Sequence, residues 1–230
     1  MKILYIMEKH LSYPGHPKFE PQKWNKNKYI KHSHNCYTYA LNTIIKKNIK
    51  TCKKYSNLSK KKRKTLKQKL KKICVKNFNT WGWCDYHKPD KCAFIRPQPG
   101  LYTKTIKKYN KKNHSSNIRT LSKLLLKDNP KIKKLRKNQT PPLGYYIIYL
   151  IPTFYTKFKK GDYHFLRQDN TGNWSEKWGD GPAKKIKEKT PEEYLKNLKK
   201  NMRSSSIFKG YYFAVPIKGK KNFRNLMKKI

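Results

Sequence analysis

The sequence predicts an α+β fold in which N-terminal helices pack on a C-terminal antiparallel sheet. Apolar residues recur at helical spacing in the first half of the chain, whereas apolar runs and alternation typical of strands appear after residue 144. The chain has 230 residues, which is long enough for one sizeable core. We therefore expect a single domain over 32–230, preceded by an extended N-terminal arm over 1–31.

The helices are predicted from their caps and from apolar positions three and four residues apart. They are expected over 36–47, 59–75, 116–127 and 191–201. Asn35 and Thr190 are suitable N-caps for the first and the last of these helices. The helix over 59–75 lies within a lysine-rich segment at 55–75, whose charges indicate a face in contact with water.

The strands are predicted from apolar runs and from alternating apolar and polar residues. They are expected over 145–151, 163–168, 173–178 and 211–217. Residues 169–172 read Asp-Asn-Thr-Gly, a sequence typical of a hairpin turn. We therefore expect the second and third of these strands to be antiparallel neighbours.

The formal net charge of the chain is +46, which comes from 58 basic and 12 acidic residues. Only 7 of the basic residues are arginine, and lysine acts as a point charge and not as a bidentate reader of phosphates or bases. Abundant Lys, Asn, Ile and Tyr also match the coding bias of an AT-rich genome, so the charge alone identifies no partner. We expect non-specific binding to polyanions, nucleic acid included, through counterion release.

The cysteine content and the hydropathy bear on the compartment. The chain has 5 cysteines, an odd number at a density below that of secreted disulfide scaffolds. Its apolar N-terminus is too short for a signal peptide, and no apolar run approaches the ~20 residues of a membrane span. We therefore expect no membrane span and a cytoplasmic, non-secreted protein, or a protein of the virion or the host cytoplasm if its origin is viral.

Four residues are candidate zinc ligands, with Cys52 as an additional candidate: Cys74, Cys84, His87 and Cys92. Their spacings are Cys-x2-His and Cys-x7-Cys, whereas a zinc knuckle typically needs a Cys-x2–4-Cys pair. Packing thiols, or a disulfide formed under oxidation, are favoured over a metal site. We expect no metal and no cofactor.

Cys36 and His164 are the candidate nucleophile and base. Cys36 directly follows Asn35, so its thiol lies in the first turn of a predicted helix, where free amides and the helix dipole lower the pKa of a thiol. His32 and His34 would lower that pKa further in their positive forms. We expect the backbone at Asn35 and Cys36 to hold an oxyanion. His164 lies in a predicted strand, which would fix its position as a general base.

A catalytic imidazole is oriented by a third group, and an acidic residue is the first choice here. Four of the 12 acidic residues of the chain lie near His164 in the sequence: Asp162, Asp169, Glu176 and Asp180. An odd-length turn places Glu176 across from His164, whereas an even one places Lys177 there and Ser175 on the diagonal. Asp162 shares the strand face of His164 in both cases. We rank Glu176 first and Asp162 second.

The motifs resemble those of the NlpC-type branch of papain-like cysteine hydrolases. The matching segments are Asn-Cys-Tyr-Thr-Tyr-Ala-Leu at 35–41, Gln-Pro-Gly at 98–100 and Asp-Tyr-His-Phe at 162–165. They are most similar to an uncharacterised group of bacteria and large DNA viruses with Asn-Cys-Tyr-Ala-Tyr-Ala-Leu and Asp-Tyr-His elements. The resemblance implies a papain-like fold and a thiol protease or related enzyme, a hydrolase or acyltransferase acting on an amide, peptide or ester bond. A viral origin would associate the enzyme with the virion.

The chain departs from those relatives at two places. Asn35 and Leu101 stand where the NlpC branch usually has Asp, which bears on the substrate class. Glu176, in Trp-Ser-Glu-Lys, stands where the closer group has His, which bears on the third catalytic residue. The alternative function is therefore a highly basic structural or nucleic-acid-binding virion protein that keeps a papain-like scaffold without catalysis.

Overall fold

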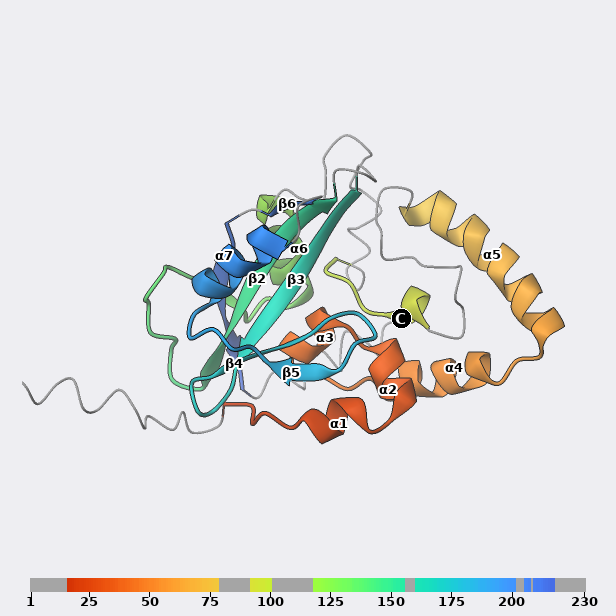
Figure 1. Cartoon of the computed structure of the whole chain (residues 1–230), viewed down its shortest axis with the longest axis horizontal. Helices are drawn as coiled ribbons and strands as arrows, with labels where there is room; N and C mark the ends of the chain where they lie inside the picture. The colour runs from red at the N-terminus through yellow and green to blue at the C-terminus, as the bar shows by residue number, and fades with distance from the viewer. Residues whose placement is uncertain are drawn as a thin grey trace, which may run out of the picture.

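A computed structural model describes residues 16–78, 92–100, 118–155, 160–201, 205–207 and 209–217. Helices occupy most of the first half of the described chain, and strands dominate the second (Figure 1). The predicted α+β class is therefore confirmed.

An antiparallel sheet forms the centre of the molecule. Its strands are β1 (Lys133–Leu135), β2 (Tyr145–Tyr155), β3 (Lys160–Gln168), β4 (Trp174–Lys177), β5 (Ala183–Lys185), β6 (Ser205–Ile207) and β7 (Tyr211–Pro216). Within the described residues the order is β1-β7-β2-β3-β4-β5, and β6 also pairs with β2. Every described pair is antiparallel, including the β3–β4 hairpin that the Asp-Asn-Thr-Gly turn predicts.

Seven α-helices and one short 3-10 helix are seen in the described part of the chain. They are α1 (Pro21–Asn25), α2 (Lys28–Ser33), α3 (Cys36–Ala40), α4 (Lys46–Ser56), α5 (Lys60–Phe78), η3 (Ala93–Ile95), α6 (Ile118–Asp128) and α7 (Pro191–Asn201). The prediction for α7 is confirmed together with its cap, because the Glu193 amide donates to Thr190 Oγ1 over 3.2 Å. None of the helices described is both long and apolar enough to cross a membrane.

The arm predicted to be extended over 1–31 is helical where the structure describes it beyond residue 20. Pro21 stands at the start of α1, where its fixed φ suits a helix. Asn27 caps α2, since its side chain accepts hydrogen bonds from the amides of Tyr29 and Ile30. These local caps outweigh the weak periodicity of the segment. Residues 1–15 lie outside the described part.

The single helix predicted over 36–47 is wrong, because α3 ends at Ala40 and α4 begins at Lys46. Asn42 adopts a φ of 46°, the left-handed conformation that commonly ends helices and that Asn tolerates. The Thr43 amide donates back to the carbonyl of Thr38 over 3.0 Å and closes the helix end. Apolar residues continue at helical spacing through this break, so the periodicity hides it.

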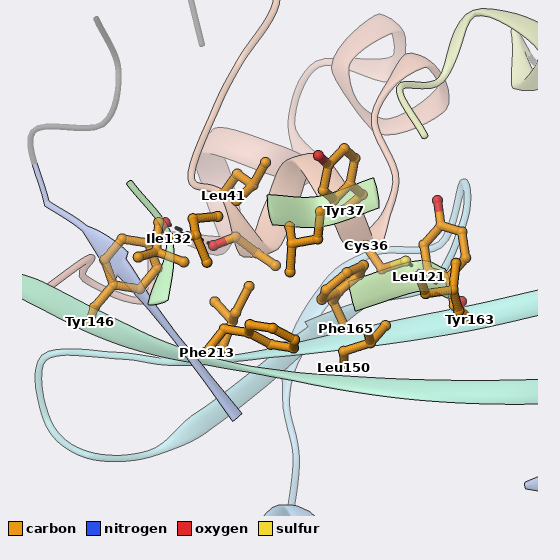
Figure 2. Close-up of a cluster of buried hydrophobic side chains, with 14 of the residues drawn as sticks. Cys36, Tyr37, Leu41, Leu121, Ile132, Tyr146, Leu150, Tyr163, Phe165 and Phe213 are labelled. Carbon is orange, nitrogen blue, oxygen red and sulfur yellow. Dashed lines mark hydrogen bonds between the residues drawn. The ribbon is translucent and has the colours of Figure 1, made fainter. Parts of the chain in front are cut away.

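Helices cover both faces of the sheet. On β2, Ile148 and Leu150 belong to a core shared with α3 and α6, whereas Tyr149 and Ile151 belong to a core shared with α7. Because both faces are buried, β2 reads as a nearly continuous apolar run. Figure 2 shows the first core, in which Cys36 joins the side chains from the sheet.

α4 is fastened to the segment 92–100. A disulfide joins Cys52 to Cys92, with their Cα atoms 5.5 Å apart, and Asn48 Nδ2 donates to the carbonyl of Ile95 over 2.8 Å. Both sulfurs are therefore unavailable as zinc ligands. The Cys74 side chain and the segment 79–91, which holds the other two candidate ligands, lie outside the description.

Candidate active site

Cys36 lies where the start of α3 meets the edge of β3. The predicted cap is confirmed, because Asn35 Oδ1 accepts from the Thr38 amide over 3.3 Å. The Cys36 thiol donates to the carbonyl of Tyr163, with 3.9 Å between sulfur and oxygen. The thiol of Cys36, the candidate nucleophile, is therefore hydrogen-bonded to the backbone of the residue directly before His164.

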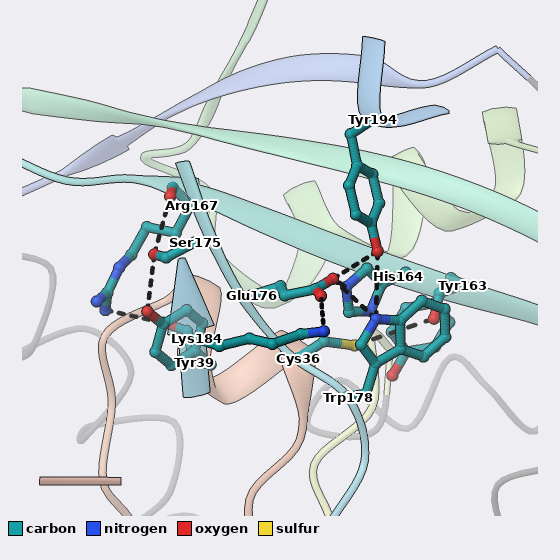
Figure 3. A network of polar contacts seen from close by, with 10 residues as sticks. All are labelled: Cys36, Tyr39, Tyr163, His164, Arg167, Ser175, Glu176, Trp178, Lys184 and Tyr194. Atoms are coloured by element: carbon teal, nitrogen blue, oxygen red, sulfur yellow. Dashed lines mark hydrogen bonds and ion pairs between the residues drawn. The ribbon is translucent and has the colours of Figure 1, made fainter. Parts of the chain in front are cut away.

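His164 and Glu176 are joined by a buried hydrogen bond. Imidazole Nε2 lies 2.9 Å from Glu176 Oε2, and both side chains are almost fully buried. The other ring nitrogen, Nδ1, is buried and has no hydrogen-bond partner among the residues that the structure describes. Figure 3 shows Cys36, His164 and Glu176 within one group of side chains. Glu176 thus holds the imidazole at Nε2, whereas Nδ1 makes no hydrogen bond with the described residues.

Glu176 is surrounded by donors. Its Oε2 also accepts from Tyr194 Oη at 2.6 Å and from Trp178 Nε1 at 2.8 Å, and its Oε1 lies 3.2 Å from Lys184 Nζ. Burial alone would raise the pKa of Glu176, but His164, Tyr194 and Lys184 together lower that pKa to about 2. Glu176 is therefore a carboxylate at neutral pH.

Trp178 fixes the plane of the imidazole. The rings of Trp178 and His164 are stacked, with centroids 3.8 Å apart and planes 9° apart (Figure 3). Trp178 is partly exposed and Lys184 is exposed, so the site meets solvent at these two side chains. Because Glu176 holds one edge of the imidazole and Trp178 one face, the direction of Nδ1 is set by the protein.

The pairing of His164 with Glu176 arises from a register that differs from the expected one. The sheet pairs Glu176 with Leu166, so Glu176 lies diagonally to His164 and not across from it. The turn over 169–173 has an odd number of residues, but it is longer than the turn that would place Glu176 directly across from His164. Asp169 Oδ1 closes this turn by accepting from the amides two and four residues on. The diagonal is still within reach of a long side chain.

Asp162, the second-ranked acid, is directed elsewhere. Its Oδ1 accepts from the Tyr163 amide over 2.8 Å, and within the described residues it makes no hydrogen bond with His164. Burial raises the pKa of Asp162 to about 6. The structure therefore brings Glu176, and not Asp162, to the imidazole.

The expectation of a thiol with a lowered pKa is wrong for the structure as it stands. Burial, followed by the charge of Asp162, raises the pKa of Cys36 to about 12 against the opposing effect of the amides of Phe165 and Tyr37. α3 has only 5 residues, so its dipole is small. Cys36 alone is consequently a thiol.

His34 does not take the positive form that would lower the pKa of Cys36. Its Nε2 accepts from the Ile45 amide over 2.8 Å, which requires that nitrogen to be unprotonated. Burial is the main cause that lowers the pKa of His34 to about 4. His34 therefore supports the start of α4 as a neutral side chain, and in that form it does not lower the pKa of Cys36.

The backbone amides of Asn35 and Cys36, which are expected to hold an oxyanion, differ in whether another group of the protein already accepts their hydrogen bond. The Asn35 amide donates to Thr38 Oγ1 over 3.0 Å, and Asn35 Nδ2 donates to the carbonyl of Pro97 over 2.9 Å. The Cys36 amide is the first of α3, where no carbonyl of the helix can reach it. Cys36 N–H is therefore the better placed of the two.

Lys177 is a fully buried lysine of β4 whose charge acts on Cys36. Its Nζ donates to the carbonyls of Lys31, His34 and Gly179 over 2.8, 2.7 and 2.7 Å. Two of these carbonyls belong to the end of α2 and the residue after it, directly before the Asn35 cap. Burial, followed by the charge of Arg96, lowers the pKa of Lys177 to about 7. Lys177 thus ties β4 to the backbone that carries the thiol.

Comparisons of the chain with protein-family models, with curated proteins and with solved structures found no match. The arrangement must therefore be interpreted from its own chemistry. Among the residues that the structure describes, no group of three or more His, Cys, Asp and Glu side chains could hold a metal ion.

Sequence reasoning missed three members of the site. Trp178 follows Glu176 by two residues, so the period of a strand places both on one face, a signal that was present. Tyr194 comes from α7 and Lys184 from β5, and no local pattern links either residue to His164. Their roles depend on tertiary packing.

Proposed function

We propose that the protein is a papain-like thiol hydrolase or acyltransferase that acts on an amide, peptide or ester bond. One observation carries the proposal: His164 is oriented by Glu176 at Nε2, and its buried Nδ1 has no partner within the described part of the chain. Leaving a buried nitrogen unpaired costs about 1–3 kcal/mol, so such a group suggests a role in which it gains a proton. Cys36, hydrogen-bonded to the residue before His164, is the proton donor at hand.

In the proposed reaction the Cys36 thiol gives its proton to His164 Nδ1 as the sulfur attacks the carbonyl carbon of the substrate. The carbonyl oxygen becomes an oxyanion, which the Cys36 amide can bind. Collapse of this intermediate breaks the bond to the leaving group, and that group takes the proton from Nδ1. Cys36 is then an acyl thioester. Water, or another acceptor nucleophile, loses a proton to His164 and releases the acyl group, which restores the thiol.

Glu176 supports both proton transfers. Because its pKa is lowered to about 2, it stays ionised while His164 carries a positive charge. A carboxylate bound to the opposite nitrogen stabilises the imidazolium that forms and holds the tautomer that leaves Nδ1 able to accept. Acidic and neutral side chains both orient the catalytic imidazole in thiol and serine hydrolases. Glu176, at the position where the similar group has His, is therefore compatible with the proposal.

The raised pKa of the isolated thiol is consistent with this scheme. Transfer of the proton to Nδ1 produces a thiolate and an imidazolium together, whose attraction offsets the cost of burying each charge. The two groups then titrate as a pair and not singly. The proposal therefore requires His164 for any reactivity of Cys36 near neutral pH.

The experiment that tests the proposal is acylation by p-nitrophenyl acetate, read by release of nitrophenolate and by mass spectrometry of the peptide that holds Cys36. The wild type is expected to carry an acetyl group on Cys36, and Cys36→Ala and His164→Ala to lose both signals. Cys74→Ala is the matched control and should behave as the wild type. A folded wild type without acetyl-Cys36, or a His164→Ala variant that acylates equally fast, favours the alternative of a basic protein without catalysis.

A further inference from the structure

The lysines of α4 form one stripe on its outer face. Lys46, Lys47, Lys50, Lys53 and Lys54 are all exposed, and their spacing places them on the same side of the helix. The opposite side faces the body, where Cys52 is bonded to Cys92. The disulfide therefore fixes the direction in which this stripe points.

α5 continues the basic surface away from the sheet (Figure 1). Its exposed basic side chains in the described range are Lys60, Lys61, Lys62, Arg63, Lys64, Lys67 and Lys69. The sequence has no acidic residue between Glu20 and Asp85, and no ion pair in the described part of the chain involves a lysine of α4 or α5. Within the described residues, the positive charge of these two helices is therefore not neutralised by acidic side chains.

The charge distribution along α5 works against the helix itself. Five consecutive basic residues at 60–64 occupy its N-terminal turns, where the helix dipole is already positive and acidic residues are preferred. Lysines four residues apart, such as Lys60 and Lys64, also repel each other. Such a conflict between the helix preferences of the residues and the helix they form is typical of functional surfaces. A bound polyanion would neutralise these charges and so remove the conflict.

The same helices are poorly suited to a membrane surface or to single-stranded nucleic acid. Membrane-surface helices need an exposed apolar face, whereas Leu66 is partly buried and Leu70 is buried. Single strands bind through bases stacked on aromatic side chains, and over 46–70 the one aromatic residue is Tyr55, which is partly buried. Lysines alone suit the phosphates of a duplex.

We propose that the exposed basic faces of α4 and α5, here called the basic arm, bind the phosphate backbone of duplex nucleic acid. The contacts are those of lysine ammonium groups with phosphates, and the only arginine of the arm is Arg63, so binding is independent of base sequence. This binding site is separate from the proposed catalytic site and does not require Cys36.

The test measures fluorescence anisotropy of a labelled 20-base-pair DNA duplex with the full chain over a range of salt concentrations. In the arm variant, Lys60, Lys61, Lys62, Lys64, Lys67 and Lys69 are changed to Gln. In the control variant, the exposed lysines 185, 187, 189, 196, 199 and 200 are changed to Gln. Each variant lowers the formal net charge of +46 by six, so only the place of the lost charge differs.

The arm variant is expected to bind the duplex at least about tenfold more weakly, with a salt slope shallower by about 5, at about 0.9 per lost phosphate contact. The control variant should stay within about twofold of the wild type, as should Cys36→Ala. An equal loss in the two lysine variants would show that binding follows net charge, which overturns the proposal. Tighter binding to phosphatidylserine vesicles or to poly-glutamate than to the duplex overturns it as well.

A second measurement on the wild type does not depend on how the variants fold. Lysines are acetylated briefly with an N-hydroxysuccinimide ester, with and without the duplex, and the modified peptides are quantified. Lysines of the arm should be protected several-fold by the duplex, whereas Lys196, Lys199 and Lys200 should not. Uniform protection, or none on the arm, contradicts the proposal.

Discussion

The imidazole of His164 lies flat against the indole of Trp178, with ring centroids 3.8 Å apart. The same indole donates to Glu176, which holds the edge of the imidazole, so one tryptophan contacts both members of the pair. The proposed base is consequently fixed in plane and in direction before any substrate binds.

Replacing Trp178 with Ala should slow turnover of p-nitrophenyl acetate by about 10- to 100-fold, because a base displaced by about 1 Å can lose that much rate. Trp178→Phe keeps an aromatic face on His164 while losing the hydrogen bond to Glu176, so its loss should be smaller. The measurement is kcat/KM at pH 7.5 for the two variants and the wild type. Equal rates in all three would show that the stacking does not position the base.

The charge of Glu176 should make stability depend on acid pH. Its folded-state pKa of about 2 lies below the ordinary value of 4.5, so the stabilisation is complete above 4.5 and is lost as the pH falls towards 2. The advantage of the wild type over Glu176→Gln in the free energy of unfolding should shrink by about 2 kcal/mol between pH 6 and pH 3. Urea unfolding at the two pH values measures it, and a constant difference contradicts the ionised state of Glu176.

Lys177→Met should destabilise the protein by about 1–3 kcal/mol, because three carbonyls lose their donor and this outweighs the gain from removing a buried charge. Lys184→Met, on the neighbouring strand with an exposed side chain, is the control and should cost less than about 1 kcal/mol. Urea unfolding at pH 6, below the Lys177 pKa of about 7, compares the two variants. Equal costs would mean that the buried ammonium does not hold the end of α2.

The Cys52–Cys92 disulfide should stabilise the chain by about 2–4 kcal/mol, as expected for a bond that closes a loop of this length. Adding dithiothreitol should lower the unfolding midpoint of the wild type to that of the double variant Cys52→Ser, Cys92→Ser. The double variant should not respond to the reductant. A wild-type midpoint unaffected by dithiothreitol, with both thiols shown to be free, would contradict the contribution of this bond.

The sequence predicted the local features of the site because they depend on neighbouring residues. Asn35 as a cap, the start of the helix at Cys36 and the hairpin after His164 are each encoded within a few positions. Asn42 ended α3 through a backbone conformation that hydrophobic periodicity does not detect. The left-handed tolerance of Asn was the signal that could have predicted this end.

The environment of the site was not predictable in the same way. Tyr194 and Lys184 reach Glu176 from elements distant in the sequence, and burial raises the pKa of Cys36 where the helix start alone suggested a decrease. A positive His34 would have lowered the pKa of Cys36, yet His34 Nε2 accepts from an amide eleven residues further on. Burial and long-range hydrogen bonds decide these properties.

The central claim is that His164 takes the proton of Cys36. The measurement that tests it most directly is the rate of Cys36 alkylation by iodoacetamide from pH 5 to pH 11, followed by peptide mass spectrometry in the wild type and in His164→Ala. The account predicts a wild-type rate that reaches its plateau below pH 8. In His164→Ala, the rate at pH 7.5 should fall by at least about 100-fold and still be rising past pH 9, since the thiol alone has a pKa of about 12. Superimposable profiles in the two proteins would contradict the account.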